Sequence, residues 1–241
     1  MSDASTPGAP CAPTPALCAP CAPTPGAPCA PTTALRAPLT PIAGLGGAEA
    51  RSDLIGAARI AEVPDIAFAS VSRRLGQDAA FADAARATFA APMPDPGRWH
   101  AAGGWRAMWT GPGQWLVDAP FARGDDIAGR LKAGFGAAAS ITEQTDAWAT
   151  FALSGEDAIA VLERLCPVDL HAMAAGHAAR TSVEHVGCHL VCRAPGRDYD
   201  LIAVRSFALA LRHALIAAAE SVARPVTARD PVTPRAADDR P

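Results

Sequence analysis

Two copies of one short pattern limit what this 241-residue chain can fold into. In each copy, a strand-like run leads through a Pro-Gly step into a second strand-like run and then into an amphipathic helical pattern. The first copy turns at Pro112-Gly113 and the second at Pro195-Gly196. Glycine takes positive φ at little steric cost, so each step suits a tight turn between antiparallel strands. The repeat predicts a duplicated α+β unit.

The strands and helices expected from the hydrophobic pattern follow a similar order around both turns. The first series comprises strands at 59–63 and 66–73, a helix at 78–90, strands at 105–110 and 115–118, and a helix around 125–135. The second series comprises strands at 138–142, 147–153, 180–185, 188–193 and 199–204, a helix between Ser154 and Pro167, and a helix at 206–222. The proline-containing stretch 91–104 is expected to be a loop.

Local signals in the sequence predict the start and end of one helix of the second series and the buried face of the other. Ser154, with Asp157 three residues later, approximates a capping box at a helix start. Pro167 is expected to stop that helix, because the residue before proline disfavours the α region. The last helix is expected to bury one apolar stripe, which comprises Phe207, Leu211, Leu215 and Val222.

The two series predict an α+β fold of two ferredoxin-like half-units with antiparallel sheets, similar to the folate-binding fold of aminomethyltransferases. The expected boundaries are 42–136 for the first half-unit and 137–223 for the second. Residues 1–41 hold 11 of the 23 prolines and repeat CAPTP, so a disordered Cys/Pro-rich tail is expected there. Residues 224–241 are expected to be a flexible C-terminal tail.

Composition excludes several classes of partner. The formal charge of −3 at pH 7 gives no basic face for nucleic acid. No apolar run reaches the roughly 20 residues that a membrane-spanning helix requires. The N-terminus lacks the charged and apolar regions of a signal peptide. We therefore expect a cytoplasmic protein that binds neither nucleic acid nor membrane.

Four of the five tryptophans lie within 17 residues: Trp99, Trp105, Trp109 and Trp115. Such a cluster can form a stacking platform for a flat ligand, such as a pterin or a base. It can also fill the core of an alanine-rich chain, or lie at a protein interface, where tryptophan is enriched. The sequence favours packing, including an interface, over the platform.

One segment contains four possible metal ligands at short spacing: His185, Cys188, His189 and Cys192. On a continuous strand the two histidines point to one face and the two cysteines to the other, whereas a chelate needs all four to converge. Cys18 and Cys21 form a CxxC in the tail, but a structural zinc site needs four ligands. We expect no metal site, and we expect Cys166, Cys188 and Cys192 to be free, buried thiols.

The remaining candidates for catalysis lack partners. His171 and His177 could act as a general acid or base, but no nucleophile or paired carboxylate is recognisable near them. Three arginines near the second hairpin could hold an anion or line a solvated strand edge: Arg193, Arg197 and Arg205. No phosphate loop, dinucleotide fingerprint or metalloprotease motif occurs. No catalytic, cofactor-binding or metal-binding residue is expected in this chain.

Three groups of residues occur in a fixed order. They are GPGQWL at 111–116 with TD at 145–146 and LSGEDA at 153–158; LCPVDLH at 165–171; and YDL at 199–201 with VRSF at 204–207. In this order and at these distances they resemble the gamma subunit of heterotetrameric sarcosine oxidase, over about residues 34–222. A more distant likeness extends to the glycine-cleavage aminomethyltransferases.

The resemblance implies an assembly of alpha, beta, gamma and delta subunits that oxidatively demethylates sarcosine to glycine. Oxygen becomes hydrogen peroxide, and the one-carbon unit can pass to tetrahydrofolate. FAD, FMN and NAD are implied on the alpha and beta subunits, tetrahydrofolate on alpha and zinc on delta. The resemblance therefore predicts a non-catalytic gamma subunit with no cofactor in this chain.

Two other hypotheses stay open at this stage. The tryptophan cluster and the distant likeness suggest a stand-alone folate- or pterin-binding one-carbon module. The segment 185–192 suggests, more weakly, a metal-binding protein.

Overall fold

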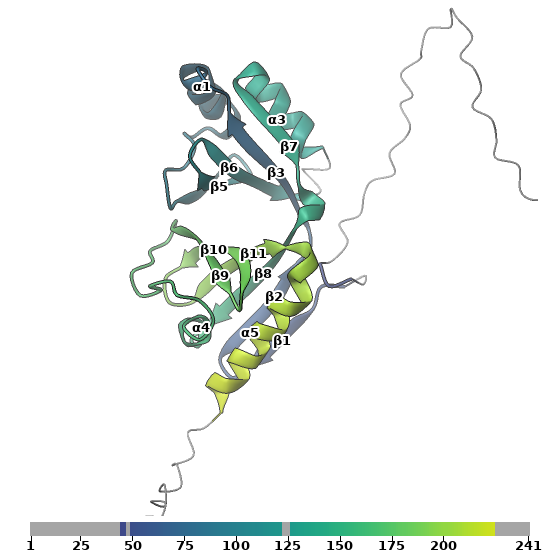
Figure 1. The fold of residues 1–241 in the computed structure, drawn as a ribbon, viewed down its shortest axis with the longest axis vertical. Coiled ribbons are helices and arrows are strands. Elements are labelled where there is room, and N and C mark those ends of the chain that lie inside the picture. Colours follow the sequence, from purple (N-terminus) through teal and green to yellow (C-terminus); the bar gives the residue numbers. More distant parts are fainter. Residues whose placement is uncertain (1–43, 47–48, 122–125, 225–241) are drawn as a thin grey trace, which may run out of the picture. The chain divides into compact units, whose positions relative to one another are not determined.

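The computed structural model describes residues 44–46, 49–121 and 126–224. They form two antiparallel sheets with helices, so the predicted α+β class is confirmed (Figure 1). The tail predicted at 1–41, its CxxC pair and residues 225–241 lie outside the described residues.

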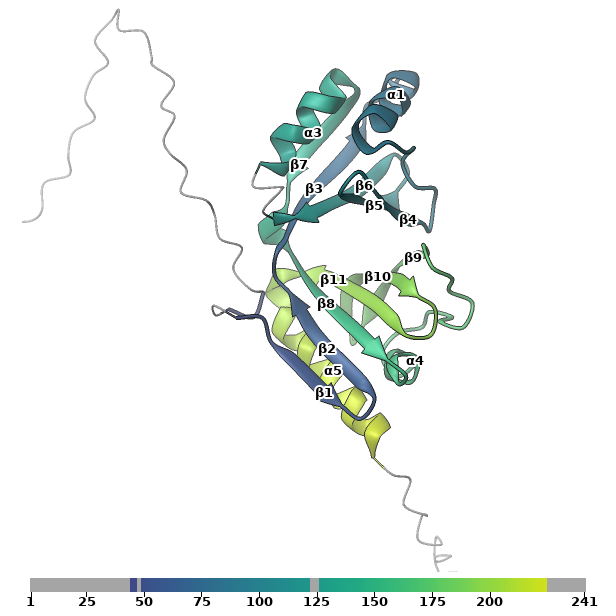
Figure 2. The same cartoon turned by 180° about the vertical axis from the view of Figure 1, so that it is seen from behind.

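The five-stranded sheet has the strand order β4-β5-β6-β3-β7. Its strands are β3 (Ile66–Arg73), β4 (Trp99–Ala102), β5 (Trp105–Gly111), β6 (Gln114–Pro120) and β7 (Ala139–Glu143). Helices α1 (Asp78–Phe89) and α3 (Ile127–Phe135) lie side by side on one face of this sheet (Figure 2). The core between sheet and helices is rich in aromatic rings.

The six-stranded sheet has the strand order β1-β2-β8-β11-β10-β9. Its strands are β1 (Ser52–Ile55), β2 (Ala58–Val63), β8 (Trp148–Gly155), β9 (Ala178–Val183), β10 (Val186–Ala194) and β11 (Asp198–Val204). Helices α4 (Ala158–Leu162) and α5 (Ala208–Ala223) pack against one face. This core is mainly aliphatic.

Both sheets contain the ferredoxin-like strand order, but their strands follow one another along the chain in different ways. The five-stranded sheet takes the four strands of this arrangement, β3, β5, β6 and β7, in chain order around α1 and α3. In the six-stranded sheet, β8, β10 and β11 are followed by α5, and the fourth strand is β2 from the start of the chain. Strand β2 pairs with β8 in register, with Ala61 opposite Ala152.

The predicted division between residues 136 and 137 therefore cuts across both sheets. Strand β7 follows residue 137 but completes the first sheet, and β1 and β2 precede it but complete the second. The reason is that no strand follows α5 in the described residues, so the open edge of β8 is filled from upstream. Two short connections, β2 to β3 and β7 to β8, carry the chain between the sheets.

Two strands were not predicted. Strand β1 lies in the glycine-rich segment before β2, and β4 lies in the stretch 91–104 that was expected to be a loop. The three prolines of that stretch all precede β4, so they remove no donor from its pairing with β5.

Three details of the predicted helices were wrong. Ser154 belongs to β8 and caps no helix; α4 starts after Asp157, whose Oδ2 accepts from the Ala57 backbone N–H at 2.9 Å instead of capping. Helix α4 ends well before Pro167, which therefore does not stop it. Phe207 is 51% exposed, because it lies in the 3-10 turn that precedes α5 and outside the buried stripe.

The faces of the two sheets that carry no helix meet in a thin layer of apolar residues. Its buried members come from both sheets and are Phe68, Met108, Leu116, Ala178, Val191 and Ile202. Partly buried Trp99 and Trp148 pack against them. The layer is mainly apolar, and a group of charged side chains that joins the two sheets forms the site described next.

Candidate functional site

The tryptophans predicted as a cluster do not share one surface. Trp115 stacks on Phe81 with ring centroids 5.1 Å apart, and Trp105 meets Phe89 edge-on at 5.9 Å, both inside the helix-covered core. Trp99 lies on the opposite face and donates from Nε1 to the Cys192 carbonyl oxygen at 3.0 Å. These contacts agree with packing and not with a common stacking platform.

The possible metal ligands between residues 185 and 192 diverge, as strand alternation predicts. Cys188 and Cys192 are buried free thiols in the core of the six-stranded sheet. His189 points to the other face, where its ring centroid is 5.6 Å from that of Trp148. His185 lies in the preceding turn at φ 68°. Among the described residues no group of three or more His, Cys, Asp or Glu side chains could hold a metal ion.

The other candidate residues have separate local roles. His171 Nε2 lies 3.0 Å from Glu163 Oε1 on the surface, and His177 joins β4 through an isolated bridge to Arg98. Arg205 donates to the backbone carbonyl oxygen of Asp146 between β7 and β8. Of the three arginines, Arg193 alone belongs to the charged cluster described next.

That cluster joins the two sheets. Arg106 on β5 donates from Nε to Asp118 Oδ2 on the neighbouring strand at 2.8 Å, and from Nη1 to Asp200 Oδ2 on β11 at 2.5 Å. Arg193 on β10 pairs with the other oxygen of Asp200 at 3.1 Å. We call these four residues the Arg106 cluster. In the described part of the chain, Arg106–Asp200 is the one ion pair that crosses from sheet to sheet.

Burial dominates the electrostatics of the cluster. The side chains of Arg106, Asp118 and Asp200 are 15%, 9% and 7% exposed. Burial raises the pKa of Asp118 to about 6, although Arg106 opposes this shift. Burial lowers the pKa of Arg106, but Asp118 and Asp200 outweigh it, so that pKa is raised. Arg106 Nη2 is buried and finds no hydrogen-bond acceptor within the described residues.

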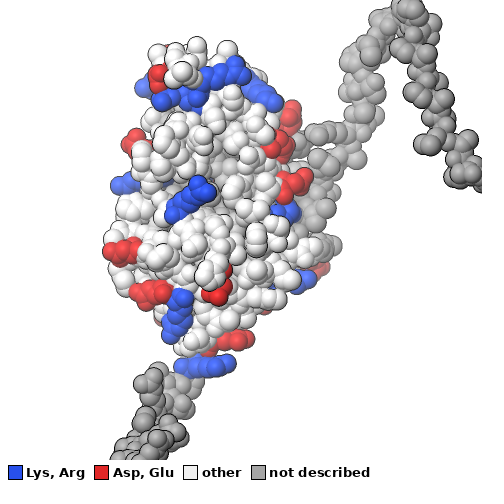
Figure 3. Space-filling model, viewed as in Figure 1, with Lys and Arg blue, Asp and Glu red and all other residues white. Residues whose placement is uncertain are grey.

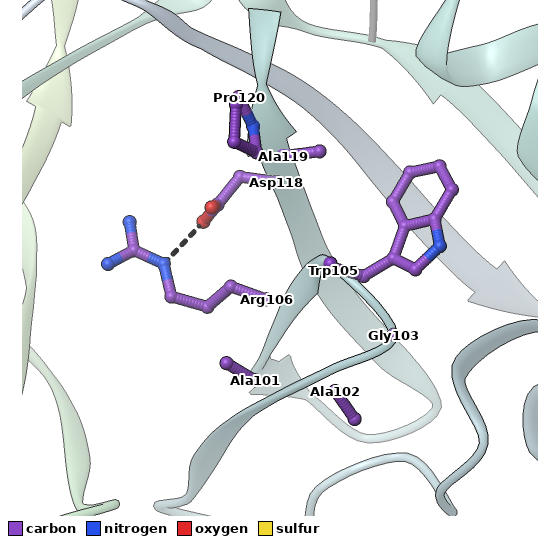
Figure 4. A pocket seen from close by; sticks show the side chains of 9 residues that line it. Ala101, Ala102, Gly103, Trp105, Arg106, Asp118, Ala119 and Pro120 are labelled. Atoms are coloured by element: carbon purple, nitrogen blue, oxygen red, sulfur yellow. Dashed lines mark hydrogen bonds and ion pairs between the residues drawn. The ribbon is translucent and has the colours of Figure 1, made fainter. Parts of the chain in front are cut away.

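A cavity of about 370 Å³ lies beside the cluster, at the turn between β4 and β5 (Figure 4). Arg106 and Asp118 are its charged lining, and the rest comes from residues 101–105, Ala119 and Pro120. The described lining includes no Ser, Cys, His or Lys side chain that could act as a nucleophile or base.

The geometry of the cluster shows a charged bridge between the two sheets. Two guanidinium groups and two carboxylates balance in charge when all are ionised, so neither a free anion nor a free cation has a net attraction to it. A buried pair whose partners are hydrogen-bonded fixes geometry well but adds little net stability. The Arg106 cluster therefore acts as a clasp between the sheets.

Sequence reasoning missed this cluster, although a signal was present. Arg106 and Asp118 are the charged residues within otherwise apolar runs on either side of the first Pro-Gly turn. They are direct cross-strand partners in the hairpin. Opposite charges directly across an antiparallel pair attract each other. The partnership with Asp200 had no such signal, because 94 residues separate it from Arg106.

Helix α5 and the 3-10 turn before it form the one described helical segment that is long and apolar enough to cross a membrane. The test uses length and composition alone. In this fold Leu211 and Leu215 of α5 pack in the core, and Arg212 pairs with Asp53 of β1 at 2.8 Å. These contacts make it a helix that covers the six-stranded sheet.

No protein-family model matches the chain, and no curated protein sequence matches it. Its fold is similar to that of a chain in the heterotetrameric sarcosine oxidase from Corynebacterium sp. U-96, in complex with pyrrole 2-carboxylate. The TM-score is 0.63 at 21% identity, and the match covers 73% of this chain and 90% of that chain. Aminomethyltransferase T of the glycine cleavage system from Bartonella henselae gives a TM-score of 0.49 at 12% identity, over 70% of this chain and 51% of that chain. At this identity, the likeness to the oxidase chain establishes a shared fold.

Proposed function

We propose that this chain is the gamma subunit of a heterotetrameric sarcosine oxidase and carries no catalytic residue of its own. The observation that supports this proposal is the extent of the structural match, which covers 90% of the oxidase chain and 73% of this one. A match over nearly the whole of a chain of similar size is expected for equivalent subunits. A domain inside a larger enzyme would match only part of it. The strings at 111–116 and 165–171 point to the same subunit.

In this proposal the chemistry belongs to the partner subunits, alpha, beta and delta. They would hold FAD, FMN, NAD, tetrahydrofolate and zinc, and would oxidise sarcosine to glycine in the cytoplasm. This chain would contribute a body of fixed shape. The Arg106 cluster, which spans the two sheets, suits that role better than it suits binding or turnover.

The surface also supports an assembled state. Large apolar side chains are more than two-fifths exposed at five described positions: Leu54, Leu75, Val204, Phe207 and Leu209. Three of them follow closely along the chain at the end of β11 and the start of α5. Neighbouring exposed apolar groups are typical of surfaces that other proteins cover.

Copurification tests the proposal. Tagged full-length chain, expressed in its native host during growth on sarcosine, is expected to recover flavin-bearing subunits with sarcosine oxidase activity. Deletion of the gene is expected to reduce that activity. A chain that purifies alone, together with unchanged sarcosine oxidation in the deletion strain, would contradict the proposal.

A titration separates this function from a stand-alone folate module. Tryptophan fluorescence of the isolated chain is expected to stay flat as tetrahydrofolate is added to micromolar concentrations. Saturable quenching would favour the folate module instead.

A further inference from the structure

The turn from β3 to α1 presents a fully exposed leucine. Leu75 has a relative exposure of 101%, compared with 76% for Leu54, the next most exposed large apolar side chain described. Gly76 follows at φ +74°, and no atom lies within 4 Å of where its Cβ would be. The side chain of Leu75 therefore projects from the protein as a small apolar knob.

Backbone hydrogen bonds hold this knob in place. The N–H of Arg73 donates to Gly113 O at 2.9 Å, and the N–H of Arg74 donates to Ala138 O at 3.0 Å. The turn closes through the Gln77 N–H, which donates to Arg74 O at 3.1 Å. These bonds tie the residues before the leucine to the turn between β5 and β6, to the 3-10 turn before β7 and to the start of α1. A backbone that is already fixed in this way loses little conformational freedom when the turn binds a partner.

The part of the fold that carries the knob has a basic surface. Figure 3 shows Lys and Arg side chains gathered over the part of the fold that carries α1 and α3. Segments 73–89 and 126–136 contain five Lys or Arg and three Asp, whereas the whole chain has a net charge of −3. Arg73 is paired with Asp78 at 2.7 Å. Within the described residues, Lys132 has no ion-pair partner, and Arg74 has only the Ser140 hydroxyl, 3.2 Å from its Nε.

We infer that this turn is a docking knob: Leu75 enters an apolar pocket of a partner protein whose rim carries Asp or Glu side chains facing Arg74 and Lys132. Charge complementarity selects an acidic partner surface. The leucine selects a protein over a nucleic acid, because it needs an apolar pocket. The inference rests on the proposed function, in which the partner is another subunit of the oxidase.

Paired variants of the full chain test the knob in the native host. Leu75→Asp and Arg74→Glu are each expected to lower the recovery of partner subunits about tenfold or more, as at other interface hot spots. The matched controls are Leu54→Asp, an exposed leucine on the other sheet, and Arg197→Glu, an exposed arginine on the second hairpin. All four positions are on the surface, so the melting temperatures are expected to be unchanged.

The outcomes separate the two proposals. If the unmodified chain recovers flavin-bearing subunits and Leu75→Asp recovers them equally well, the inference that Leu75 docks into a partner is wrong, and the proposed function stands. An equal loss for Leu54→Asp would also overturn the knob, because the effect would then not be specific to that turn.

A second measurement keeps the knob testable if the unmodified chain recovers no oxidase subunit. A photocrosslinking amino acid is placed at position 75, and in a matched sample at position 54, in living cells. A crosslink specific to position 75, to one identified protein at a peptide containing Asp or Glu, and lost on Arg74→Glu, would support the knob and contradict the proposed function. No specific crosslink, or a crosslink to nucleic acid, would overturn the knob.

Discussion

The two sheets reach the same strand arrangement with different cores. In the five-stranded sheet, Phe81 lies 5.1 Å from both Trp115 and Phe135, and Phe89 lies 5.8 Å from Phe135, measured between ring centroids. In the six-stranded sheet, the core is mainly aliphatic, with three thiols and the rings of Phe151 and Tyr199. Both covering helices are alanine-rich, but α1 contributes Phe81 and Phe89 to its core, whereas α5 contributes Leu211 and Leu215. The comparison shows that volume and pattern, more than residue identity, specify the arrangement.

The sheets also differ in how the chain builds them. The five-stranded sheet comes from one continuous segment, from Ile66 to Glu143. The six-stranded sheet combines Ser52–Val63 with Trp148–Val204, so it depends on contacts between distant parts of the chain. A sheet built from one segment pays less loop-closure entropy than one built from two. Five predictions follow from these contrasts.

The largest effect is expected from removing residues 1–63, which takes β1 and β2 away. The six-stranded sheet would lose the partner of β8, and its core would lose Ala58 and Ile60. We expect that sheet to unfold while the five-stranded sheet keeps its structure, because every strand of the latter remains. Hydrogen exchange measured by mass spectrometry checks this. Uniform loss of protection in both sheets would show that the five-stranded sheet is not independent.

The next largest effects are expected from substitutions that each remove a large side chain from one of the two cores. Phe89→Ala removes a ring that contacts Trp105 and Phe135, and is expected to cost about 3–5 kcal/mol of unfolding free energy. Leu211→Ala in α5 is expected to cost about 2–5 kcal/mol. Urea unfolding gives the totals, and hydrogen exchange is expected to show each loss mainly in the sheet that carries the substitution. Equal loss in both sheets for either variant would contradict two separate cores.

The clasp between the sheets is tested by Arg106→Met against Arg193→Met. The first leaves two buried carboxylates without their shared partner and is expected to cost about 3–5 kcal/mol. The second removes a side chain that is 40% exposed and is expected to cost at most about 1 kcal/mol. Chemical denaturation measures both. Similar costs for the two variants would mean that Arg106 holds no special position in the cluster.

Buried Asp118 in the five-stranded sheet and buried His189 in the six-stranded sheet are expected to make the free energy of unfolding depend on pH in opposite directions. The pKa of Asp118 is raised by burial from 3.8 to about 6, so its contribution to stability is full below pH 3.8 and is lost as pH rises through 6. The pKa of His189 is lowered by burial, and further by Arg180, from 6.5 to about 4. Its contribution is full above pH 6.5 and is lost as pH falls through 4.

Single substitutions that remove each titratable group are expected to reveal its contribution to stability. Relative to the unmodified chain, Asp118→Asn is expected to gain stability as pH rises from 4 to 6, and His189→Gln is expected to lose it between 4 and 6.5. Each relative change is on the order of 1 to 3 kcal/mol. Urea unfolding at several pH values measures both. Two differences that change in the same direction would contradict the assigned burial.

Small effects are also expected at the two Pro-Gly turns. Gly113 and Gly196 have φ of +67° and +80°. A Cβ at Gly113 would meet only Arg73 atoms at ordinary contact distance, and one at Gly196 would meet nothing within 4 Å. Replacing either with alanine is therefore expected to cost about 1–2 kcal/mol, from backbone strain alone. Thermal unfolding of the two variants compares them; a much larger cost at one turn would show that the hairpins are not equivalent.

Periodicity predicted most of the strands and helices because their buried positions repeat locally. The strand at 66–73 has the bounds that the sequence predicts, and Phe81, Ala85 and Phe89 form the buried side of α1. Prediction from the sequence failed for short elements, because few residues carry the hydrophobic pattern there. Strand β4 has only four residues and follows three prolines, and α4 has only five, so a cap residue placed at Ser154 could equally end a strand.

The candidate site could be predicted only in part. The cross-strand pair Arg106–Asp118 lies within one hairpin and could have been inferred from its spacing. The bond to Asp200 could not, because no local rule brings the two hairpins face to face. The sequence predicts that no nucleophile lies in a recognisable motif. That statement remains a prediction.

By itself the sequence determined the α+β class, the two Pro-Gly hairpins and the opposed faces of His189 and the two cysteines on β10. These features depend on neighbours within a few residues, where φ, side-chain alternation and periodicity act directly. Only the tertiary structure decided that β2 completes the sheet of β8, that Arg106 clasps one sheet to the other, and that Leu75 stands free. Those outcomes depend on which distant surfaces meet, since an unpaired strand edge or a buried charge is stabilised by whatever partner the whole fold brings to it.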